Sequence, residues 1–306
     1  MWSTPEGSIL GPLLFLIYIN DLARVSSFDV RLFADDACLI LDDKNPKRLE
    51  NNINHELIKI NNWMKINKLS INYDKTNYMI FTKKRNDSNF CLQLDGHKLQ
   101  RVTNAKYLGV ILNDKLNWTS HINNIYTKIS KASYILCKIR HYVNLHTRKM
   151  IYYSLVYPHL TYCISSWGGA PKTTLQSINR LHNKILRIIT FSDFKSPSAP
   201  LYFKLQMLTI TDIYNLKLAT LIHNIHNHKF TGSNNLVLLQ DFHSYQTRLA
   251  NSNNFFQQFT SSNLTQSTFS SAGLRFWRSL PNDIKLVKPS SFKYKVKYFL
   301  LNKYNS

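Results

Sequence analysis

The chain has 306 residues, with 39 Lys and Arg against 17 Asp and Glu, a formal net charge of +22 and 44% hydrophobic residues. This apolar content excludes a disordered polybasic tail, which lacks the hydrophobic residues needed to fold. The length allows one large domain or two ordinary ones. So strong an excess of positive charge indicates an anionic partner, either nucleic acid or an acidic membrane surface.

The charge is unevenly distributed along the chain. Up to and including Asp114 there are 15 basic residues against 13 acidic ones, a net of +2, whereas the remainder has 24 against 4, a net of +20. We therefore expect a near-neutral region over residues 1–114, followed by basic regions over residues 115–190 and 191–306.

The cysteines and the apolar segments indicate the compartment. The four cysteines are far apart and form no CxxC pair, which favours a reducing environment and argues against a zinc knuckle. They are Cys38, Cys91, Cys137 and Cys163. The most apolar run, residues 9–19, contains Gly11 and Pro12 and is too short to span a bilayer. With no signal-peptide pattern either, we expect a soluble intracellular protein, nuclear or cytoplasmic.

The first elements in chain order are a helix, a hairpin and a second helix. Residues 9–22 are apolar almost all round and follow a capping Ser8, which predicts a buried helix. Two short apolar segments, 30–34 and 37–41, flank Asp35-Asp36 and predict a β-hairpin with two carboxylates at its tip. Asn45-Pro46 then opens an amphipathic helix that runs to about residue 64.

The rest of the near-neutral region predicts short strands. Their ranges are 69–72, 78–82, 90–94, 98–102 and 107–112, with a turn at Asp95-Gly96. We therefore predict a mixed sheet with one or two covering helices over residues 1–114.

Asp35 and Asp36 are the candidate chemical residues. Adjacent carboxylates repel one another, so they must be solvated or must bind a cation. Mg²⁺ prefers one or two carboxylates together with phosphate oxygens, which suits phosphoryl transfer. Adjacent acids in turns are common, however, and Asp42-Asp43 is a second such pair. Without further context a solvated turn is the more frequent explanation.

Four motifs in sequence order supply that context. They are Gly7-Ser8-Ile9-Leu10-Gly11-Pro12, Phe33-Ala34-Asp35-Asp36, Leu69-Ser70-Ile71-Asn72 with Lys75-Thr76, and Tyr107-Leu108-Gly109-Val110. This order resembles the palm motifs of reverse transcriptases. Residues 19–22 and 114–118 are most similar to the non-LTR (LINE-type, jockey-like) retrotransposon enzymes. The resemblance covers about residues 5–170, with a weaker similarity at 276–281.

The resemblance implies an RNA-directed DNA polymerase that extends a DNA primer on an RNA template with deoxynucleoside triphosphates. Asp35 and Asp36 would be catalytic ligands of Mg²⁺, with two ions in the complete enzyme, and Lys75 a catalytic lysine beside the leaving pyrophosphate. The nucleotide- and template-binding positions would be Gly7, Ser8, Gly11 and Pro12. The primer end would be gripped by Tyr107, Leu108, Gly109 and Val110.

The sequence departs from the family pattern at its start. Glu6 stands where the family has Gln, and the two-metal mechanism needs another aspartate on a strand before Gly7-Ser8, where only Met1 to Glu6 stand. The fingers, the first palm strand and the endonuclease region of full-length relatives are expected to be missing as well. We therefore expect the C-terminal part of a reverse transcriptase, inactive alone. The alternative is a non-catalytic nucleic-acid-binding remnant.

Amphipathic helices are predicted at residues 122–139, 147–156 and 174–190. Their cations are Lys128, Lys131, Lys138, Arg140, Arg180, Lys184 and Arg187. By position these helices match the thumb of the family, so we predict contacts with nucleic-acid phosphates rather than a merely solvated basic face. The predicted fold class is thus α+β: an incomplete palm with an antiparallel sheet over 1–114, thumb-like basic helices over 115–190, and a mostly helical basic region over 191–306.

The last region is less informative. A helix is predicted at residues 205–225, and a loop or partly disordered linker at 257–271. The lysines and aromatics of residues 292–304 fit either base stacking or a short amphipathic helix docked on the core. A zinc site at His223, His226 and His228 is disfavoured because no cysteine or acid stands at ligand spacing. A membrane surface is disfavoured too, since the lysines are spread over several segments.

Overall fold

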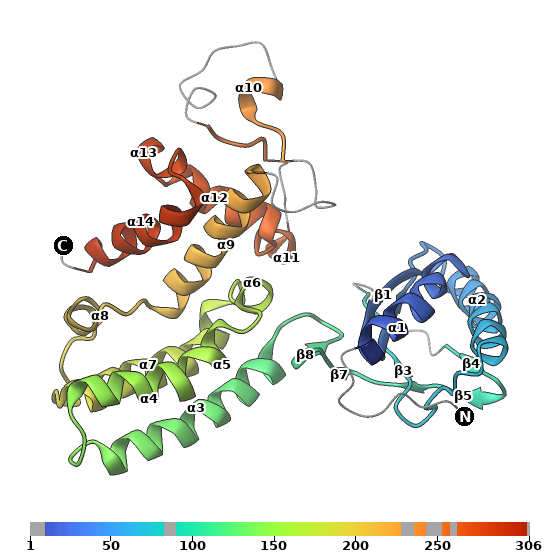
Figure 1. The fold of residues 1–306 in the computed structure, drawn as a ribbon, viewed down its shortest axis with the longest axis horizontal. Helices are drawn as coiled ribbons and strands as arrows, with labels where there is room; N and C mark the ends of the chain where they lie inside the picture. Colours follow the sequence, from blue (N-terminus) through green and yellow to red (C-terminus); the bar gives the residue numbers. More distant parts are fainter. Residues whose placement is uncertain (1–9, 83–89, 228–235, 243–252, 258–261, 305–306) are drawn as a thin grey trace. The chain divides into compact units, whose positions relative to one another are not determined.

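The computed structural model describes residues 10–82, 90–227, 236–242, 253–257 and 262–304. The chain divides into two compact units, the front unit at residues 1–105 and the helical unit at residues 106–306 (Figure 1). The fold is α+β, with many helices and small sheets.

The front unit combines helices with very short strands. Its elements are α1 (Leu10–Ile19), a 3₁₀ helix (Asn20–Arg24), β1 (Asp29–Phe33), β2 (Asp36–Ile40), α2 (Pro46–Ile66), β3 (Asn77–Tyr78), β4 (Gln93–Leu94), β5 (His97–Lys98) and β6 (Gln100–Arg101). The predicted hairpin and the predicted amphipathic helix are both confirmed. Asn45 caps α2 because its side chain accepts hydrogen bonds from the backbone N–H groups of Lys47 and Arg48.

The predicted mixed sheet does not form as a single sheet in the described residues of the front unit. The strands form separate two-stranded ladders: β1 with β2, β4 with β5, both antiparallel, and β3 with β6, which is parallel. Residues 69–72 and 79–82 are not strands, so they provide no neighbour for the edges of the β1–β2 hairpin. Strands of two residues also leave little ladder for a further strand to join. The turn at Asp95-Gly96 is confirmed, and both residues have positive φ, 53° and 78°.

The prediction that the first helix is buried is also wrong. Only Ile19 of α1 is buried, and Leu10 and Ile17 are 64% and 65% exposed. The front core is formed mainly by α2 and the strands around it, with Leu22, Leu57, Ile60, Leu92 and Leu94 among its buried members. Helix α1 is apolar on all sides, but only one side can pack against this core. The other sides therefore remain exposed.

The helical unit begins with a hairpin and continues as packed helices. Its elements are β7 (Asn104–Tyr107, where the chain passes from the front unit), β8 (Val110–Asn113), α3 (Thr119–Ile139), α4 (Leu145–Leu155), α5 (Tyr157–Thr161), α6 (Ile164–Trp167), α7 (Lys172–Thr190), α8 (Ala199–Leu205), α9 (Ile210–His226), α10 (Leu239–Phe242), α11 (Asn263–Gln266), a π-helical turn (Phe269–Gly273), α12 (Leu274–Arg278), α13 (Asn282–Lys285) and α14 (Pro289–Asn302). The three amphipathic helices predicted from periodicity are confirmed as α3, α4 and α7.

One hydrophobic core runs through the helical unit. It extends from Ile122 in α3 to Leu301 in α14 and includes Trp167 and Trp277, so residues on both sides of position 190 share it. Helices α3, α4 and α7 lie side by side, and α9 runs beside α12 and α14 (Figure 1). For the described residues, none of the helices is long and apolar enough to cross a bilayer.

The C-terminal predictions have mixed outcomes. The predicted helix at 205–225 is interrupted between α8 and α9, where Gln206 adopts positive φ. Residues 257–271 include α11 and the start of the π-helical turn, so the predicted loop is wrong where it is described, and residues 258–261 lie outside the described part. Of the two alternatives for residues 292–304, the docked helix is confirmed: Phe292, Val296 and Leu300 of α14 are buried.

Candidate functional site

The two candidate metal-binding carboxylates lie at the end of the β1–β2 hairpin. Phe33 pairs with Asp36 as the last rung of the ladder, which leaves Ala34 and Asp35 as a two-residue turn. Ala34 has φ of 50°, the left-handed value that tight hairpin turns need at their first central position. Both aspartates are exposed, and in the described part of the chain neither side-chain carboxylate accepts a hydrogen bond or forms an ion pair.

Other predicted polymerase residues lie in the same front unit. Gly11 and Pro12 are in the first turn of α1, whereas Gly7 and Ser8 lie outside the described residues. Lys75 is exposed in a turn in which its backbone N–H donates to the side-chain oxygen of Asn72 at 3.1 Å. Among the described residues no ion pair joins its ammonium to either aspartate of the hairpin tip.

The donor set at the hairpin tip fits a magnesium ion that is completed by substrate. Unpartnered exposed carboxylates are available as ligands, and Mg²⁺ is commonly held by one or two carboxylates with water and phosphate oxygens filling the other positions. In the described part of the chain, however, no group of three or more His, Cys, Asp or Glu side chains could enclose a metal ion. That finding covers the described histidines His223 and His226 as well, while His228 lies outside.

The predicted primer-contacting residues form a hairpin tip rather than a strand. Tyr107 ends β7 and Val110 begins β8, and both residues between them have positive φ, 45° at Leu108 and 78° at Gly109. Two consecutive left-handed residues reverse the chain, so the predicted strand over 107–112 is wrong. The hydroxyl of Tyr162 donates to the Leu108 carbonyl at 2.6 Å and ties the tip to the segment after α5.

The predicted cations of the helical unit lie opposite the core. In α3 Lys128, Lys131 and Lys138 are exposed, at spacings of three and seven residues that place them on one face. The opposite face is buried through Ile122, Ile125, Ile129, Ala132 and Leu136. In α7 Arg180 and Lys184 are exposed in the same manner. All five side chains are exposed, and the Lys138 ammonium also lies 5.6 Å from the centroid of the Tyr134 ring.

The two remaining predicted cations already make contacts within the protein. Arg187 is half-buried and donates from Nε and Nη2 to the Ser196 carbonyl, at 2.9 and 2.7 Å, so it braces the loop after α7. Arg140 is half-buried at the end of α3 and donates from Nε to Nε2 of His141 at 3.1 Å. Arg140 also lies over the ring of Phe191, which sequence reasoning did not single out.

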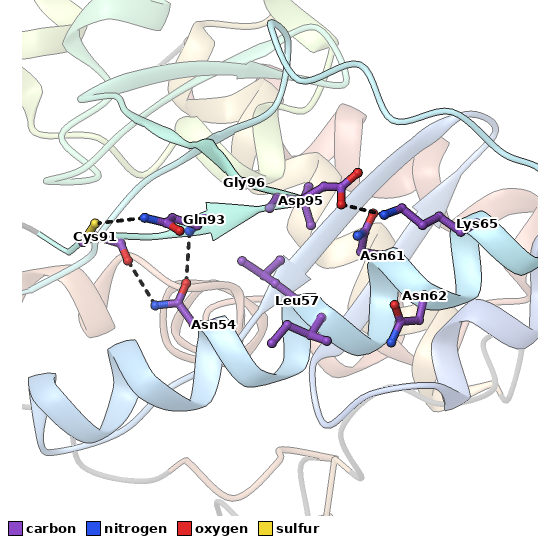
Figure 2. A pocket seen from close by; sticks show the side chains of 11 residues that line it. Asn54, Leu57, Asn61, Asn62, Lys65, Cys91, Gln93, Asp95 and Gly96 are labelled. Atoms are coloured by element: carbon purple, nitrogen blue, oxygen red, sulfur yellow. Dashed lines mark hydrogen bonds and ion pairs between the residues drawn. The ribbon is translucent and has the colours of Figure 1, made fainter.

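A recess of about 620 Å³ lies in the front unit between α2 and the β4–β5 hairpin (Figure 2). Its polar groups bind one another: the Asn54 side chain donates to the Cys91 carbonyl and accepts from the Gln93 N–H, both at 3.0 Å. Lys65 pairs with Asp95 at 2.6 Å and, with other hydrogen bonds, lowers the pKa of that carboxyl. These contacts hold the hairpin on the helix, so we assign the recess a structural role.

Comparison with known proteins agrees with the motifs. Residues 3–112 match the family model described as reverse transcriptase (RNA-dependent DNA polymerase). The predicted resemblance is therefore confirmed for this region: residues 3–112 are similar to the reverse transcriptase family, and the relatives are named as RNA-directed DNA polymerases of retrotransposons. No solved structure matches the chain closely.

Three relatives come from Drosophila melanogaster. The probable RNA-directed DNA polymerase from transposon X-element is 28% identical over 219 residues, which is 69% of this chain and 24% of the relative. The RNA-directed DNA polymerase from mobile element jockey is 29% identical, over 61% of this chain and 21% of the relative. The probable RNA-directed DNA polymerase from transposon BS is 25% identical, over 68% and 24%. The matched part thus spans about a quarter of the length of these proteins.

Proposed function

We propose that this chain takes part in RNA-directed DNA synthesis by a non-LTR retrotransposon, in which deoxynucleotides are added to a DNA primer on an RNA template. The observation that carries the proposal is the exposed Asp35-Asp36 pair at the tip of the β1–β2 hairpin. The pair lies within the region that matches the reverse transcriptase family. The relatives named as RNA-directed DNA polymerases support the same activity.

In this proposal Asp35 and Asp36 hold Mg²⁺. When bound, Mg²⁺ neutralises phosphate charge and favours the ionised form of the attacking hydroxyl, as in other nucleotidyl transfers. The complete enzyme would use two ions. Lys75 would place its ammonium beside the pyrophosphate and donate a proton to it as it leaves. Gly11 and Pro12, with Gly7 and Ser8, would line the side of the site that receives nucleotide and template.

We further propose that these 306 residues do not catalyse extension alone. Two metal ions need more carboxylate ligands than the hairpin tip offers, and no cluster of three candidate ligands occurs among the described residues. The relatives are about four times as long as the part matched here, so they contain further regions outside the matched part. The exposed apolar faces of α1 offer such a region a surface to cover.

The helical unit would contact the template–primer duplex. Lys128, Lys131 and Lys138 of α3 and Arg180 and Lys184 of α7 are exposed, and the segment after Asp114 has only four acidic residues against 24 basic ones. This charge surplus also favours the second candidate function, a remnant that binds nucleic acid without catalysis. The two candidates differ in whether Asp35 matters.

A metal-binding and a primer-extension assay together test the proposal. We expect Mn²⁺, a spectroscopic substitute for Mg²⁺, to bind the chain in the presence of template–primer and nucleotide. Asp35→Asn should weaken this binding about tenfold or more, because charge-assisted ligation is lost. Asp42→Asn, which removes another exposed carboxylate of the front unit, should not. Equal Mn²⁺ binding by both variants would contradict the metal site.

Primer extension separates the remaining claims. The purified chain with Mg²⁺, RNA template and DNA primer should yield no product, whereas affinity for the template–primer should fall steeply with salt. Asp35-dependent extension by the chain alone would contradict the proposed inactivity and support the polymerase. Affinity that does not change with salt would contradict both candidate functions.

A further inference from the structure

Two arginines from different helices converge on one aromatic ring in the helical unit. Arg140 follows the end of α3, Arg148 lies near the start of α4, and Phe191 caps the end of α7. The Cζ atoms of Arg148 and Arg140 lie 4.3 and 5.3 Å from the centroid of the Phe191 ring. His141 meets the same ring edge-on, with centroids 5.2 Å apart. We name these four residues the arginine cluster.

Arg148 is buried in this cluster without a hydrogen-bond partner. Its relative exposure is 7%, and both Nε and Nη1 are buried with no acceptor among the described residues. Buried guanidinium groups are normally paired, because an uncompensated charge in a low-dielectric setting is costly. The Phe191 ring offers a favourable face for the cation but no acceptor for its N–H groups.

The cluster has two cations and no matching anion. Within the described residues no carboxylate lies within 4 Å of Arg140 or Arg148, whereas ion pairs do form in the front unit, for example Arg48 with Asp43. Burial, and then the like charge of Arg140, lower the pKa of Arg148. His141 accepts from Nε of Arg140, but an imidazole carries no negative charge and therefore provides no counter-ion.

We propose that Arg140 and Arg148 form a binding site for a single phosphate group, supplied by the backbone of a bound nucleic acid. The two buried, unpartnered nitrogens of Arg148 are Nε and Nη1, which leaves Nη2 as its donor nearest to solvent. The guanidinium charge is delocalised, so a phosphate oxygen at Nη2 compensates the whole group. Arg140 supplies a second guanidinium group that can donate hydrogen bonds to the same phosphate, and the Phe191 ring forms the apolar wall of the site. That this phosphate belongs to a nucleic acid rests on the proposed function.

The shared site predicts a specific pattern of salt dependence. Each phosphate contact contributes about 0.9 to the slope of log affinity against log salt for a duplex. Arg140→Gln and Arg148→Met should each weaken template–primer binding about tenfold and lower the slope by about 0.9. Because both arginines serve one phosphate, the double variant should lose no more slope than either single variant.

Lys172→Gln is the matched control. Lys172 is exposed at the first residue of α7, at the other end of the helix that Phe191 caps, roughly 28 Å away at 1.5 Å per residue. Lys172→Gln should change the affinity for template–primer less than twofold, within the range of an isolated surface charge. Arg148→Met removes an unpaired buried cation, so its melting temperature should be no lower than that of the parent. If Arg148→Met does not fold, Arg140→Gln alone still tests the site.

The outcomes separate the site from the proposed function. If the parent binds template–primer and the arginine variants behave like Lys172→Gln, the site is wrong and the function stands. A double variant that loses twice the slope of the single variants overturns the shared phosphate. If the parent does not bind nucleic acid, the proposed function fails. Inorganic phosphate and pyrophosphate then test the site: a melting-temperature rise that Arg140→Gln abolishes supports a free phosphate as the source, and no rise overturns the site.

Discussion

The hydroxyl of Tyr162 donates a hydrogen bond to the backbone carbonyl of Leu108, 54 residues earlier, with 2.6 Å between the two oxygens. The same ring lies against Gly109, where an added Cβ would come within 3.3 Å of its Cε1 atom. The Tyr162 backbone carbonyl in turn accepts from the Trp167 indole at 2.9 Å, and Trp167 is fully buried. The hairpin tip with the predicted primer-contacting residues is therefore anchored to the helical core.

The first prediction concerns this anchor. Tyr162→Phe should lower the free energy of unfolding of the helical unit by about 1 kcal/mol, the net value of one hydrogen bond. Gly109→Ala should cost about 1–2 kcal/mol, because φ is +78° and the neighbouring ring must move. Tyr142→Phe is the control, since Tyr142 is 89% exposed. Urea unfolding measures the differences, and equal midpoints for Tyr162→Phe and Tyr142→Phe would contradict the anchor.

The second prediction concerns the turn that presents the aspartates. Ala34 has φ of 50°, a conformation that is strained for alanine and easy for glycine. Ala34→Gly should therefore stabilise the front unit by about 0.5–1 kcal/mol. Ala37→Gly, in the adjoining strand β2, should destabilise it by about the same amount because glycine loses more backbone entropy there. Hydrogen exchange of β1 and β2 reports both effects, and the same sign for both variants would refute the strained turn.

Helices were predictable from the sequence because their periodicity is local. The spacing of Leu49, Ile53, Leu57, Ile60 and Met64 sets the buried face of α2, and the Asn45 cap sets its start. The hairpin with Asp35 was predictable for a similar reason, since two apolar segments flank an acidic pair. The resemblance to reverse transcriptases then indicated what those carboxylates would do.

Three features were not predictable from local pattern. Leu108 adopts positive φ although leucine disfavours it. The sequence pattern of residues 107–112 therefore predicted a single strand instead of a turn. The hydrophobicity of α1 indicates that its side chains favour burial but not which segment would bury them. The arginine cluster combines residues from three helices, and Arg148 and Phe191 are brought together only by packing of α4 against α7.

The third prediction is the acid sensitivity of the front unit. Glu56 is buried and accepts from Nζ of Lys59 at 2.7 Å and from the Ser27 N–H at 2.8 Å. These two hydrogen bonds, in that order, lower the pKa of Glu56 from 4.5 to about 2. The folded state therefore gains stability above pH 4.5, and this gain is lost as the pH falls from about 4.5 through about 2.

Replacing Glu56 isolates that contribution. Glu56→Gln should be less stable than the parent at pH 7, and its stability should fall less between pH 5 and pH 2. Asp42→Asn, at an exposed position of the same unit, should follow the parent curve. Hydrogen exchange of α2 across this pH range measures the effect within the front unit. A Glu56→Gln curve parallel to that of the parent would rule out the proposed linkage.

The fourth prediction concerns the apolar surface of α1. Leu13 and Ile17 are 54% and 65% exposed, whereas Ile19 is 5% exposed. The double variant Leu13→Gln, Ile17→Gln should change stability by less than about 0.5 kcal/mol and should reduce dye binding and self-association. Ile19→Ala should cost about 2–4 kcal/mol because it leaves a cavity in the front core. Light scattering and urea unfolding test both, and a double variant as unstable as Ile19→Ala would mean that α1 is buried in solution.

The fifth prediction concerns a buried histidine of the helical unit. His182 is 1% exposed, and its Nε2 and Nδ1 atoms lie 2.8 and 3.1 Å from the hydroxyls of Tyr152 and Tyr202. Burial lowers the pKa of His182 from 6.5 to about 4. As the pH falls from 6.5, the unfolded state therefore takes up a proton before the folded state does. Stability should decline by on the order of 3 kcal/mol down to about pH 4 and level off below it.

The variant His182→Gln separates this titration from the rest of the unit. Glutamine keeps a donor and an acceptor, so His182→Gln should fold but lose about 1–3 kcal/mol at pH 7 through poorer hydrogen bonding to the two tyrosines. Its decline between pH 6.5 and 4 should be shallower than that of the parent, though not absent, because burial also lowers the pKa of His121 and His159. His146→Gln, at an exposed position, should leave the pH profile unchanged. Urea midpoints across this range provide the measurement, and an unchanged slope in His182→Gln would show that His182 is accessible to protons in the folded state.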